Sequence, residues 1–93
     1  MTWKKRDYQD PLYKEFRSKV LKRDKFTCQM CKSRIRKSLE VHHIMTWANA
    51  STLRFDPMNG ITLCKSCHKD ITGKEVHFQS LFLALVQKNG KKT

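Results

Sequence analysis

The sequence predicts a small α+β domain built around a metal-bound core. Two cysteine pairs, each enclosing two residues, stand 32 residues apart. Short apolar runs of strand type lie between the pairs, and longer helical patterns lie before and after them. A chain of 93 residues makes one domain at most, and its small core often needs a metal or disulfides for stability. We therefore expect a single domain over residues 1–93.

The first element that the sequence predicts is a basic helix at about residues 10–23. Asp10 is a suitable N-cap, and Pro11 suits the first helical turn. Apolar side chains that recur every four residues should face the core; they are Leu12, Phe16 and Val20. The basic residues of the helix lie off this stripe.

The cysteine pairs predict a structural zinc site. Cys28 and Cys31 form the first pair, and Cys64 and Cys67 form the second. Two residues between thiolates let both reach one ion, and two such knuckles complete a tetrahedron with bonds of about 2.3 Å. Disulfides and buried free thiols are the alternatives. In a further alternative, His68 replaces Cys67 on the ion.

The predicted compartment favours a metal over disulfides. The first ten residues contain no apolar stretch of the kind found in secretory signals. The longest apolar run, Leu81–Val86, is far too short to span a bilayer. We therefore expect a cytoplasmic protein without membrane contact, in a compartment where thiols stay reduced.

The 32 residues between the cysteine pairs predict a strand, a loop and a second strand. Residues 34–45 contain a basic turn followed by a strand. Residues 46–60 are typical of a loop, with turn signals in an Asp-Pro and an Asn-Gly dipeptide near its end. Residues 61–63 form a short strand pattern that leads into the second knuckle.

Two helical segments are predicted after the second knuckle. The chain can turn helical from Cys67 to Ile71, and Gly73 should end that segment. A final helix follows at about residues 75–88, with an Asn-Gly dipeptide at its end. Its expected buried side chains are Phe78, Leu81, Phe82, Leu85 and Val86. A dimer contact is the alternative use of this apolar run.

The charge of the chain predicts a polyanionic partner. The formal net charge is +12, and residues 1–37 carry a net +9 from 13 Lys or Arg and 4 Asp or Glu. Such an excess is typical of proteins that bind nucleic acid, and a solvated basic surface is the simpler alternative. The candidate phosphate-binding side chains are Lys14, Arg17, Lys22, Lys32, Arg34, Arg36 and Lys37. Contacts to phosphates carry no sequence information, so we expect weak sequence preference and salt-dependent binding.

Four short motifs occur in an order that resembles the HNH endonuclease family. They are CQMC, LEVHHI, NGITLC and CKSCH, and the resemblance covers roughly residues 26–72. The three letters of the family name fall on His43, Asn59 and His68. The resemblance implies a zinc-containing ββα-metal core of treble-clef type between N- and C-terminal helices. The whole chain most resembles small stand-alone HNH proteins of bacteriophages, which implies the cytoplasm of a bacterial host.

The resemblance implies a role for each polar residue of the motif. His43 is the implied general base, since a neutral imidazole can accept a proton from water. Asn59 is implied to position the catalytic loop, to contact His43 or the metal, or to do both. His42 stands where many members have an aspartate ligand, and His68 is the other implied metal ligand. In-line attack needs the ion and the base on different sides of the phosphorus, so we expect a bend or strand end near His43.

One divalent ion is implied in addition to the structural zinc. Two imidazole ligands suit Mn²⁺, Ni²⁺, Co²⁺ or Zn²⁺ better than Mg²⁺, although Mg²⁺ with several waters remains an alternative. Other residues have weaker claims to a role. His77 could be a further ligand or a phosphate contact, and Asp56 could bind metal or only shape a turn. Trp3 and Trp47 could stack on bases or pack in the core.

The sequence thus predicts a metal-dependent DNA endonuclease of low sequence specificity. Its expected partner is double-stranded DNA, with phage packaging terminase proteins implied by the resemblance, and we expect a monomer or weak dimer. A non-catalytic zinc-dependent nucleic-acid-binding module is the alternative, because it needs only the cysteines and the basic residues. A protein adaptor that uses the C-terminal helix is a third hypothesis, against which the charge argues. Nicking, double-strand cleavage and RNA as a substrate remain open.

Overall fold

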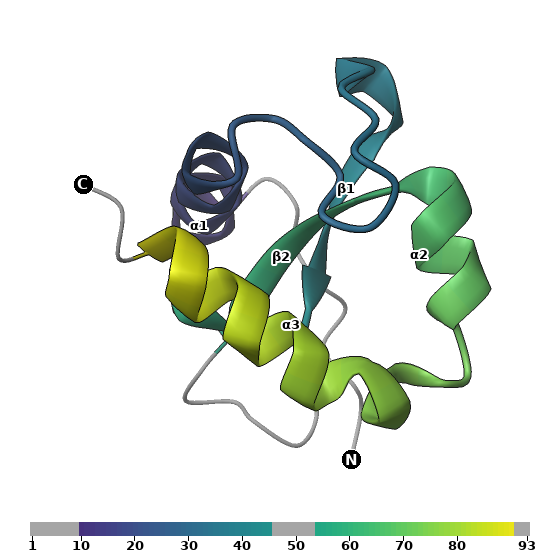
Figure 1. Ribbon diagram of the computed structural model, residues 1–93. Helices are drawn as coiled ribbons and strands as arrows, with labels where there is room; N and C mark the ends of the chain where they lie inside the picture. Colours follow the sequence, from purple (N-terminus) through teal and green to yellow (C-terminus); the bar gives the residue numbers. More distant parts are fainter. Residues whose placement is uncertain (1–9, 46–53, 91–93) are drawn as a thin grey trace, which may run out of the picture.

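The computed structural model describes residues 10–45 and 54–90, and it has a two-stranded antiparallel sheet with helices packed around it (Figure 1). The strands are β1 (Leu39–His43) and β2 (Gly60–Cys64). The α-helices in these ranges are α1 (Pro11–Arg23), α2 (Lys65–Ile71) and α3 (Glu75–Gly90), and the short 3₁₀ helices η1 (Arg36–Ser38) and η3 (Pro57–Asn59) precede the strands. The architecture is α+β, as predicted.

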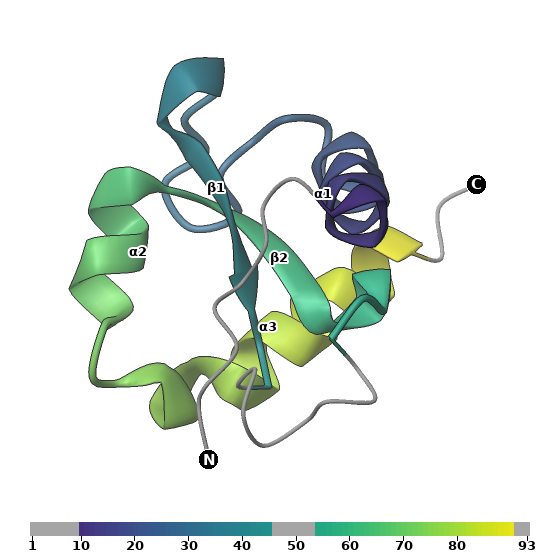
Figure 2. The same ribbon diagram turned by 180° about the vertical axis from the view of Figure 1, so that it is seen from behind.

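Consecutive side chains of β1 point to opposite faces of the sheet. His43, which pairs with Gly60 in the register, stacks on Phe16 of α1 with 4.8 Å between ring centroids. His42 meets Phe82 of α3 with 5.8 Å between ring centroids. Helix α1 therefore packs on one face and α3 on the other, and Figure 2 shows α3 behind the strands.

Helix α1 begins as the sequence predicts but buries a different face. The Asp10 carboxylate accepts the N–H of Leu12 at 2.9 Å and caps the helix. The buried side chains are Tyr13, Phe16, Val20 and Leu21. The prediction was wrong for Leu12, which is 57% exposed. Tyr13 replaces it because alternating steps of three and four residues follow the 3.6-residue turn better than a strict four-residue repeat.

Gly60 allows α1 to approach the sheet closely. The Asn-Gly dipeptide at 59–60 was predicted to form a turn, but Gly60 is instead the first residue of β2 and has an extended backbone. A Cβ atom at this position would lie 2.7 Å from both Phe16 Cζ and Val20 Cγ2. The glycine is therefore needed for helix–sheet packing rather than for a special backbone conformation.

Helix α2 starts at Lys65, two residues before the predicted start. Its N-cap is Cys64, whose sulfur accepts the N–H of Cys67 at 3.4 Å. The usual N-cap acceptors are the side-chain oxygens of Ser, Thr, Asp and Asn, so the sequence did not signal this start. The predicted stop is correct, because the helix ends at Ile71 and Gly73 follows with a left-handed φ of 86°.

Helix α3 is longer than predicted and buries fewer of the predicted side chains. It continues through Gly90, which was expected to lie at the end of the helix. Phe82 and Val86 are buried, and Phe78 and Leu85 are half-buried against the core. Leu81 is 52% exposed, which corrects its predicted burial. The reason is geometric, since Leu81 lies about 100° around the helix from Phe82.

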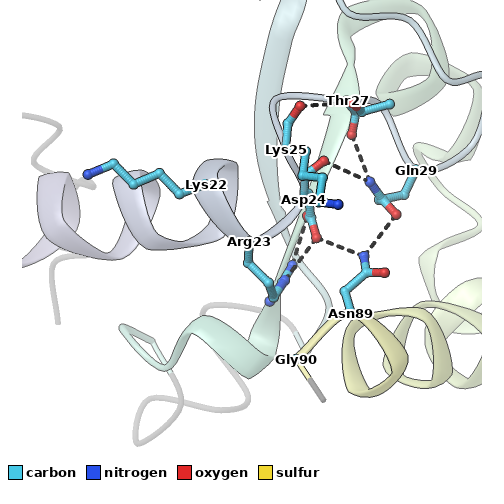
Figure 3. A pocket seen from close by; sticks show the side chains of 8 residues that line it. All are labelled: Lys22, Arg23, Asp24, Lys25, Thr27, Gln29, Asn89 and Gly90. Atoms are coloured by element: carbon cyan, nitrogen blue, oxygen red, sulfur yellow. Dashed lines mark hydrogen bonds and ion pairs between the residues drawn. The ribbon is translucent and has the colours of Figure 1, made fainter. Parts of the chain in front are cut away.

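A buried ion pair joins the end of α1 to the rest of the core. Arg23 donates from Nε and Nη2 to the two carboxylate oxygens of Asp24, at 2.8 Å each, and Asp24 is 3% exposed. Asp24 also accepts the N–H of Thr62 in β2 and the side-chain amide of Asn89 in α3. Figure 3 shows Asn89 reaching both Asp24 and Gln29. The network therefore ties α1, β2 and α3 together.

An open hollow of about 470 Å³ lies beside this ion pair (Figure 3). Its lining side chains besides the pair are Lys22, Lys25, Thr27, Gln29 and Asn89, with Gly90 at one end. None of the predicted catalytic or metal-binding residues lines it. The candidate site is therefore located by its chemistry and not by this hollow.

Within residues 10–45 and 54–90, no helix is long and apolar enough to cross a bilayer.

Candidate metal centre and catalytic site

The four cysteines meet at one point of the structure. The two knuckles, which are far apart in sequence, come together because Cys64 ends β2 while the first knuckle follows α1. All four sulfur atoms lie within 4.8 Å of one another, and Cys31 Sγ and Cys64 Sγ are 3.6 Å apart. In a tetrahedral zinc site with bonds of about 2.3 Å, sulfur atoms are about 3.8 Å apart. The cluster therefore fits a structural metal such as zinc.

Backbone hydrogen bonds shape both knuckles for metal binding. The N–H of Cys31 points at Cys28 Sγ at 3.5 Å, and the N–H of Cys67 points at Cys64 Sγ at 3.4 Å. Lys32 adopts a left-handed φ of 69°, which closes the first knuckle. Because Cys67 Sγ belongs to the cluster, four ligands are present without His68. This geometry argues against the alternative in which His68 replaces Cys67.

The electrostatics of the cluster favour a bound cation. Burial disfavours the Cys28 thiolate, but backbone N–H groups outweigh it and lower the pKa of Cys28 to about 6. Burial, and then the neighbouring thiols, raise the pKa of Cys67. The backbone of Ser33 favours the Cys31 thiolate, yet the thiols of Cys28 and Cys64 raise the pKa of Cys31 overall. A bound divalent cation would stabilise the thiolate forms of these neighbouring cysteines.

A second polar cluster forms where β1 faces α2. His42 is 7% exposed, and its ring meets the ring of His68 edge-on with 5.1 Å between centroids. His68 Nδ1 lies 2.7 Å from Glu40 Oε1. Glu40 and His42 share a face of β1 because they are two residues apart. Two of the predicted metal ligands are thus brought together, and Glu40 joins them although the sequence analysis did not single it out.

The spacing of the two imidazoles fits a shared ion. For metal–nitrogen bonds of about 2.1 Å, two imidazoles on one ion have ring centroids about 4.5–5.2 Å apart. The observed separation of 5.1 Å falls in this range. A carboxylate that binds the far nitrogen of a ligand imidazole is a common companion of such sites. The signal for Glu40 in the sequence was its spacing of two from His42 on a strand.

His43 lies on the other face of the sheet. It is 4% exposed, stacks on Phe16, and its Nε2 lies 2.8 Å from the carbonyl oxygen of Arg54. A carbonyl only accepts hydrogen bonds, so Nε2 carries the proton and the lone pair of the neutral ring resides on Nδ1. Strand β1 ends at His43, and a bend follows at Ile44 and Met45. The expected strand end near His43 is therefore found.

Asn59 connects the two sides of the β1–β2 loop. Its side chain accepts the N–H of Met45 at 2.8 Å and donates to the carbonyl of Met45 at 3.2 Å. Its own carbonyl accepts the N–H of Ile44 at 2.8 Å. Asn59 is 3% exposed, so these bonds hold the two residues that directly follow His43. The amide thereby shapes the backbone beside the candidate base.

The other residues that the sequence suggested as ligands or base contacts lie outside the two clusters or outside the described residues. Asp56 caps η3, with its side chain accepting the N–H of Met58 at 2.9 Å. His77 is exposed in the first turns of α3. Trp3 and Trp47 lie outside the described residues.

The predicted phosphate-binding side chains are all exposed and form two groups. Three lie on α1, and four lie between the first knuckle and β1. In the second group, the guanidinium of Arg36 lies 4.0 Å above the ring of Phe26 and is held there by a cation–π contact. Arg36 and Lys37 of this group lie in η1, directly before β1, and so stand at the end of the strand opposite His43.

Comparison with known families identifies the class of protein. The family model described as HNH endonuclease matches residues 28–74, which is 47 of the 93 residues. The chain therefore belongs to the HNH endonuclease family. The match contains both cysteine knuckles, the β1–β2 hairpin and α2, and it ends before α3. No curated protein and no solved structure matched the chain.

Family membership supports a nuclease-like or nucleic-acid-related activity, with DNA as the substrate that the family suggests. The α+β architecture and the four-cysteine cluster agree with a ββα-metal fold.

Proposed function

We propose that this protein is a metal-dependent DNA endonuclease of low sequence specificity. The observation that carries the proposal is the meeting of His42 and His68 on one face of β1, one residue from His43 at the strand end. The candidate base His43 and the candidate ligand His42 are neighbours on β1, and the second candidate ligand, His68, contacts His42 from α2. Phosphodiester hydrolysis needs both functions within reach of one phosphate.

His43 is proposed to take the proton from the attacking water. Its Nε2–H is engaged by the Arg54 carbonyl, which fixes the ring and leaves the basic lone pair on Nδ1. Asn59 forms hydrogen bonds with the backbone of Ile44 and Met45, and these bonds fix the backbone that directly follows His43. The stacking of Phe16 restricts the imidazole from the α1 side.

His42 and His68 are proposed to hold the catalytic ion. When bound, a divalent ion supplies charge neutralisation at the phosphoryl oxygens and the leaving 3′-oxygen. The structural zinc cluster fixes the backbone of Cys67, and His68 is the next residue, which preorganises this ligand. Two nitrogen ligands favour Mn²⁺, Ni²⁺ or Zn²⁺ over Mg²⁺.

The exposed basic groups are proposed to bind the DNA backbone on either side of the cut. They comprise Lys14, Arg17 and Lys22 on α1 and Lys32, Arg34, Arg36 and Lys37 before β1. A non-catalytic nucleic-acid-binding module would need the same groups and the zinc, but not the histidine pair at the strand end. We further propose that the protein is encoded by a bacteriophage and acts beside DNA-packaging proteins, as a monomer or weak dimer.

The test is cleavage of supercoiled plasmid at low salt with Mn²⁺, Ni²⁺, Mg²⁺ or EDTA. We expect the wild type to nick or linearise the plasmid and EDTA to stop it. His43→Gln keeps a donor for the Arg54 carbonyl but provides no base, so we expect cleavage to fall at least about 100-fold with DNA binding retained.

His77→Ala is the matched control, because His77 is an exposed histidine on α3 outside both clusters. It should cut like the wild type. If no ion supports cleavage while wild type and variants bind DNA equally, the binding-module hypothesis is correct instead. Fastest cleavage with Mg²⁺ would contradict the argument from nitrogen ligands.

A further inference from the structure

Glu40 contacts His68, the candidate ligand of the catalytic ion that lies on α2. It stands on β1, two residues before His42, and its Oε1 is 2.7 Å from Nδ1 of His68. The contact joins residues 28 positions apart in sequence, and it forms where α2 packs beside β1 (Figure 1). The side chains of His68 and Glu40 are 34% and 39% exposed.

We propose that Glu40 selects the tautomer of His68 and so directs the Nε2 lone pair of that ring to the catalytic ion. The inference rests on the proposed ion site and names the residue that orients one of its ligands. Glu40 is a positioning residue in this role, since it acts through His68.

The chemistry follows from what a carboxylate can do. An ionised carboxylate only accepts hydrogen bonds, so the nitrogen that it contacts must carry the proton. With the proton on Nδ1, the neutral His68 ring has its lone pair on Nε2. A histidine side chain in water prefers the opposite tautomer, with the proton on Nε2. Without Glu40, most His68 rings would therefore present an N–H at the atom that must bind the metal.

The surroundings of His68 indicate orientation rather than stability. The Glu40–His68 pair is too exposed for its attraction to contribute much to folding, because solvent screens such pairs. The backbone of His68 is already held by the zinc knuckle on one side and by Thr72, whose hydroxyl donates to the His68 carbonyl at 2.9 Å. The ring itself contacts His42 at 5.1 Å between centroids. What the carboxylate adds is the choice of which ring nitrogen carries the proton.

His43 provides an internal reference for this idea. Its Nε2 lies 2.8 Å from the Arg54 carbonyl, so its tautomer is opposite to that of His68 and is selected by a different group. Removal of Glu40 should leave the His43 tautomer unchanged. The two motif histidines therefore report separately in one experiment.

The experiment is long-range ¹⁵N–¹H NMR of the imidazoles in the zinc-loaded full chain, without a second metal. It is recorded at a pH of about 8.5, where imidazoles are neutral. We expect His68 with Nδ1–H and His43 with Nε2–H in the wild type. Glu40→Ala should convert His68 largely to Nε2–H without affecting His43. A wild-type His68 with Nε2–H, or an unchanged His68 in Glu40→Ala, would overturn the inference.

Calorimetric titration with Mn²⁺ and Ni²⁺ gives a second readout that is independent of cleavage. Glu40→Ala should weaken binding of the added ion by about 10- to 100-fold. Glu15→Ala, which removes an exposed glutamate on α1, should leave the affinity unchanged. Equal affinities in wild type and Glu40→Ala would also overturn the inference. If tautomer and affinity respond as expected while plasmid is never cut, Glu40 keeps its role and the proposed nuclease activity fails.

Discussion

At the scale of residues, one step along a strand separates two chemical environments. His42 contacts His68 and Phe82, whereas His43 contacts Phe16 and the Arg54 carbonyl. The alternation of side chains along β1 is the cause. Two neighbouring histidines can therefore have different functions, because one belongs to the α2 side of the hairpin and the other to the α1 side.

Gly60 gives a prediction at the same scale. Gly60→Ala should lower the free energy of unfolding by about 2 kcal/mol, because its Cβ would lie 2.7 Å from Phe16 and Val20, which are both buried and cannot move aside. Chemical denaturation of the zinc-loaded protein measures this. Gly90→Ala is the control, since its Cβ would meet only Met58 at an ordinary 3.5 Å. Equal stability of wild type and Gly60→Ala would show that α1 can retreat from the sheet without cost.

At the scale of elements, the C-terminal end of α1 is attached to η3 and β2 by polar contacts. Arg23 donates to the carbonyls of Pro57 and Gly60, which flank Asn59 on either side, at 2.6 and 2.7 Å. Asp24 holds Arg23 in place for these bonds. The end of α1 thereby supports η3 and the start of β2, where the candidate site begins.

Asp24→Asn tests this attachment. It should lower the free energy of unfolding by about 3 kcal/mol, because it leaves the Arg23 guanidinium buried without its counter-charge. Urea denaturation is the measurement. Glu15→Gln removes the exposed pair with Lys19 and should change stability by less than about 0.5 kcal/mol. Similar effects of the two substitutions would mean that the Arg23–Asp24 pair contributes no more than a surface pair.

At the scale of the whole molecule, a small apolar core is combined with a strong positive charge. The net charge of +12 opposes compaction, and the chain has only 93 residues with which to build a core. The four-cysteine cluster joins the first knuckle to the end of the hairpin and the start of α2. Metal binding at this point can supply free energy that the core lacks.

Removal of the zinc should therefore unfold the protein. Structural zinc binding contributes on the order of 10 kcal/mol in small domains, so a strong chelator should abolish the helical far-UV circular dichroism and added zinc should restore it. Lowering the pH should release the zinc as well, because protons compete for thiolates. His68→Ala should keep its zinc and its fold, since the four sulfurs complete the cluster. A folded zinc-free protein would contradict this view of its stability.

Local patterns in the chain determined the elements and the chemistry that was possible. Asp10 and Pro11 specified the start of α1, the cysteine spacing specified two knuckles, and the histidine pair specified opposite environments on one strand. These features depend on residues close together in sequence, and local geometry alone sets them. The excess of basic residues likewise needed no structure to indicate an anionic partner.

Only the tertiary structure decided which distant residues meet. In the structure Tyr13 rather than Leu12 is buried in the core, and Leu81 is exposed. The structure also shows that Gly60 leaves the space into which α1 packs. It also brought Glu40 to His68 and Arg23 to the carbonyls around Asn59. Contacts over such separations depend on how the helices pack on the sheet, and that packing cannot be derived from composition and residue spacing.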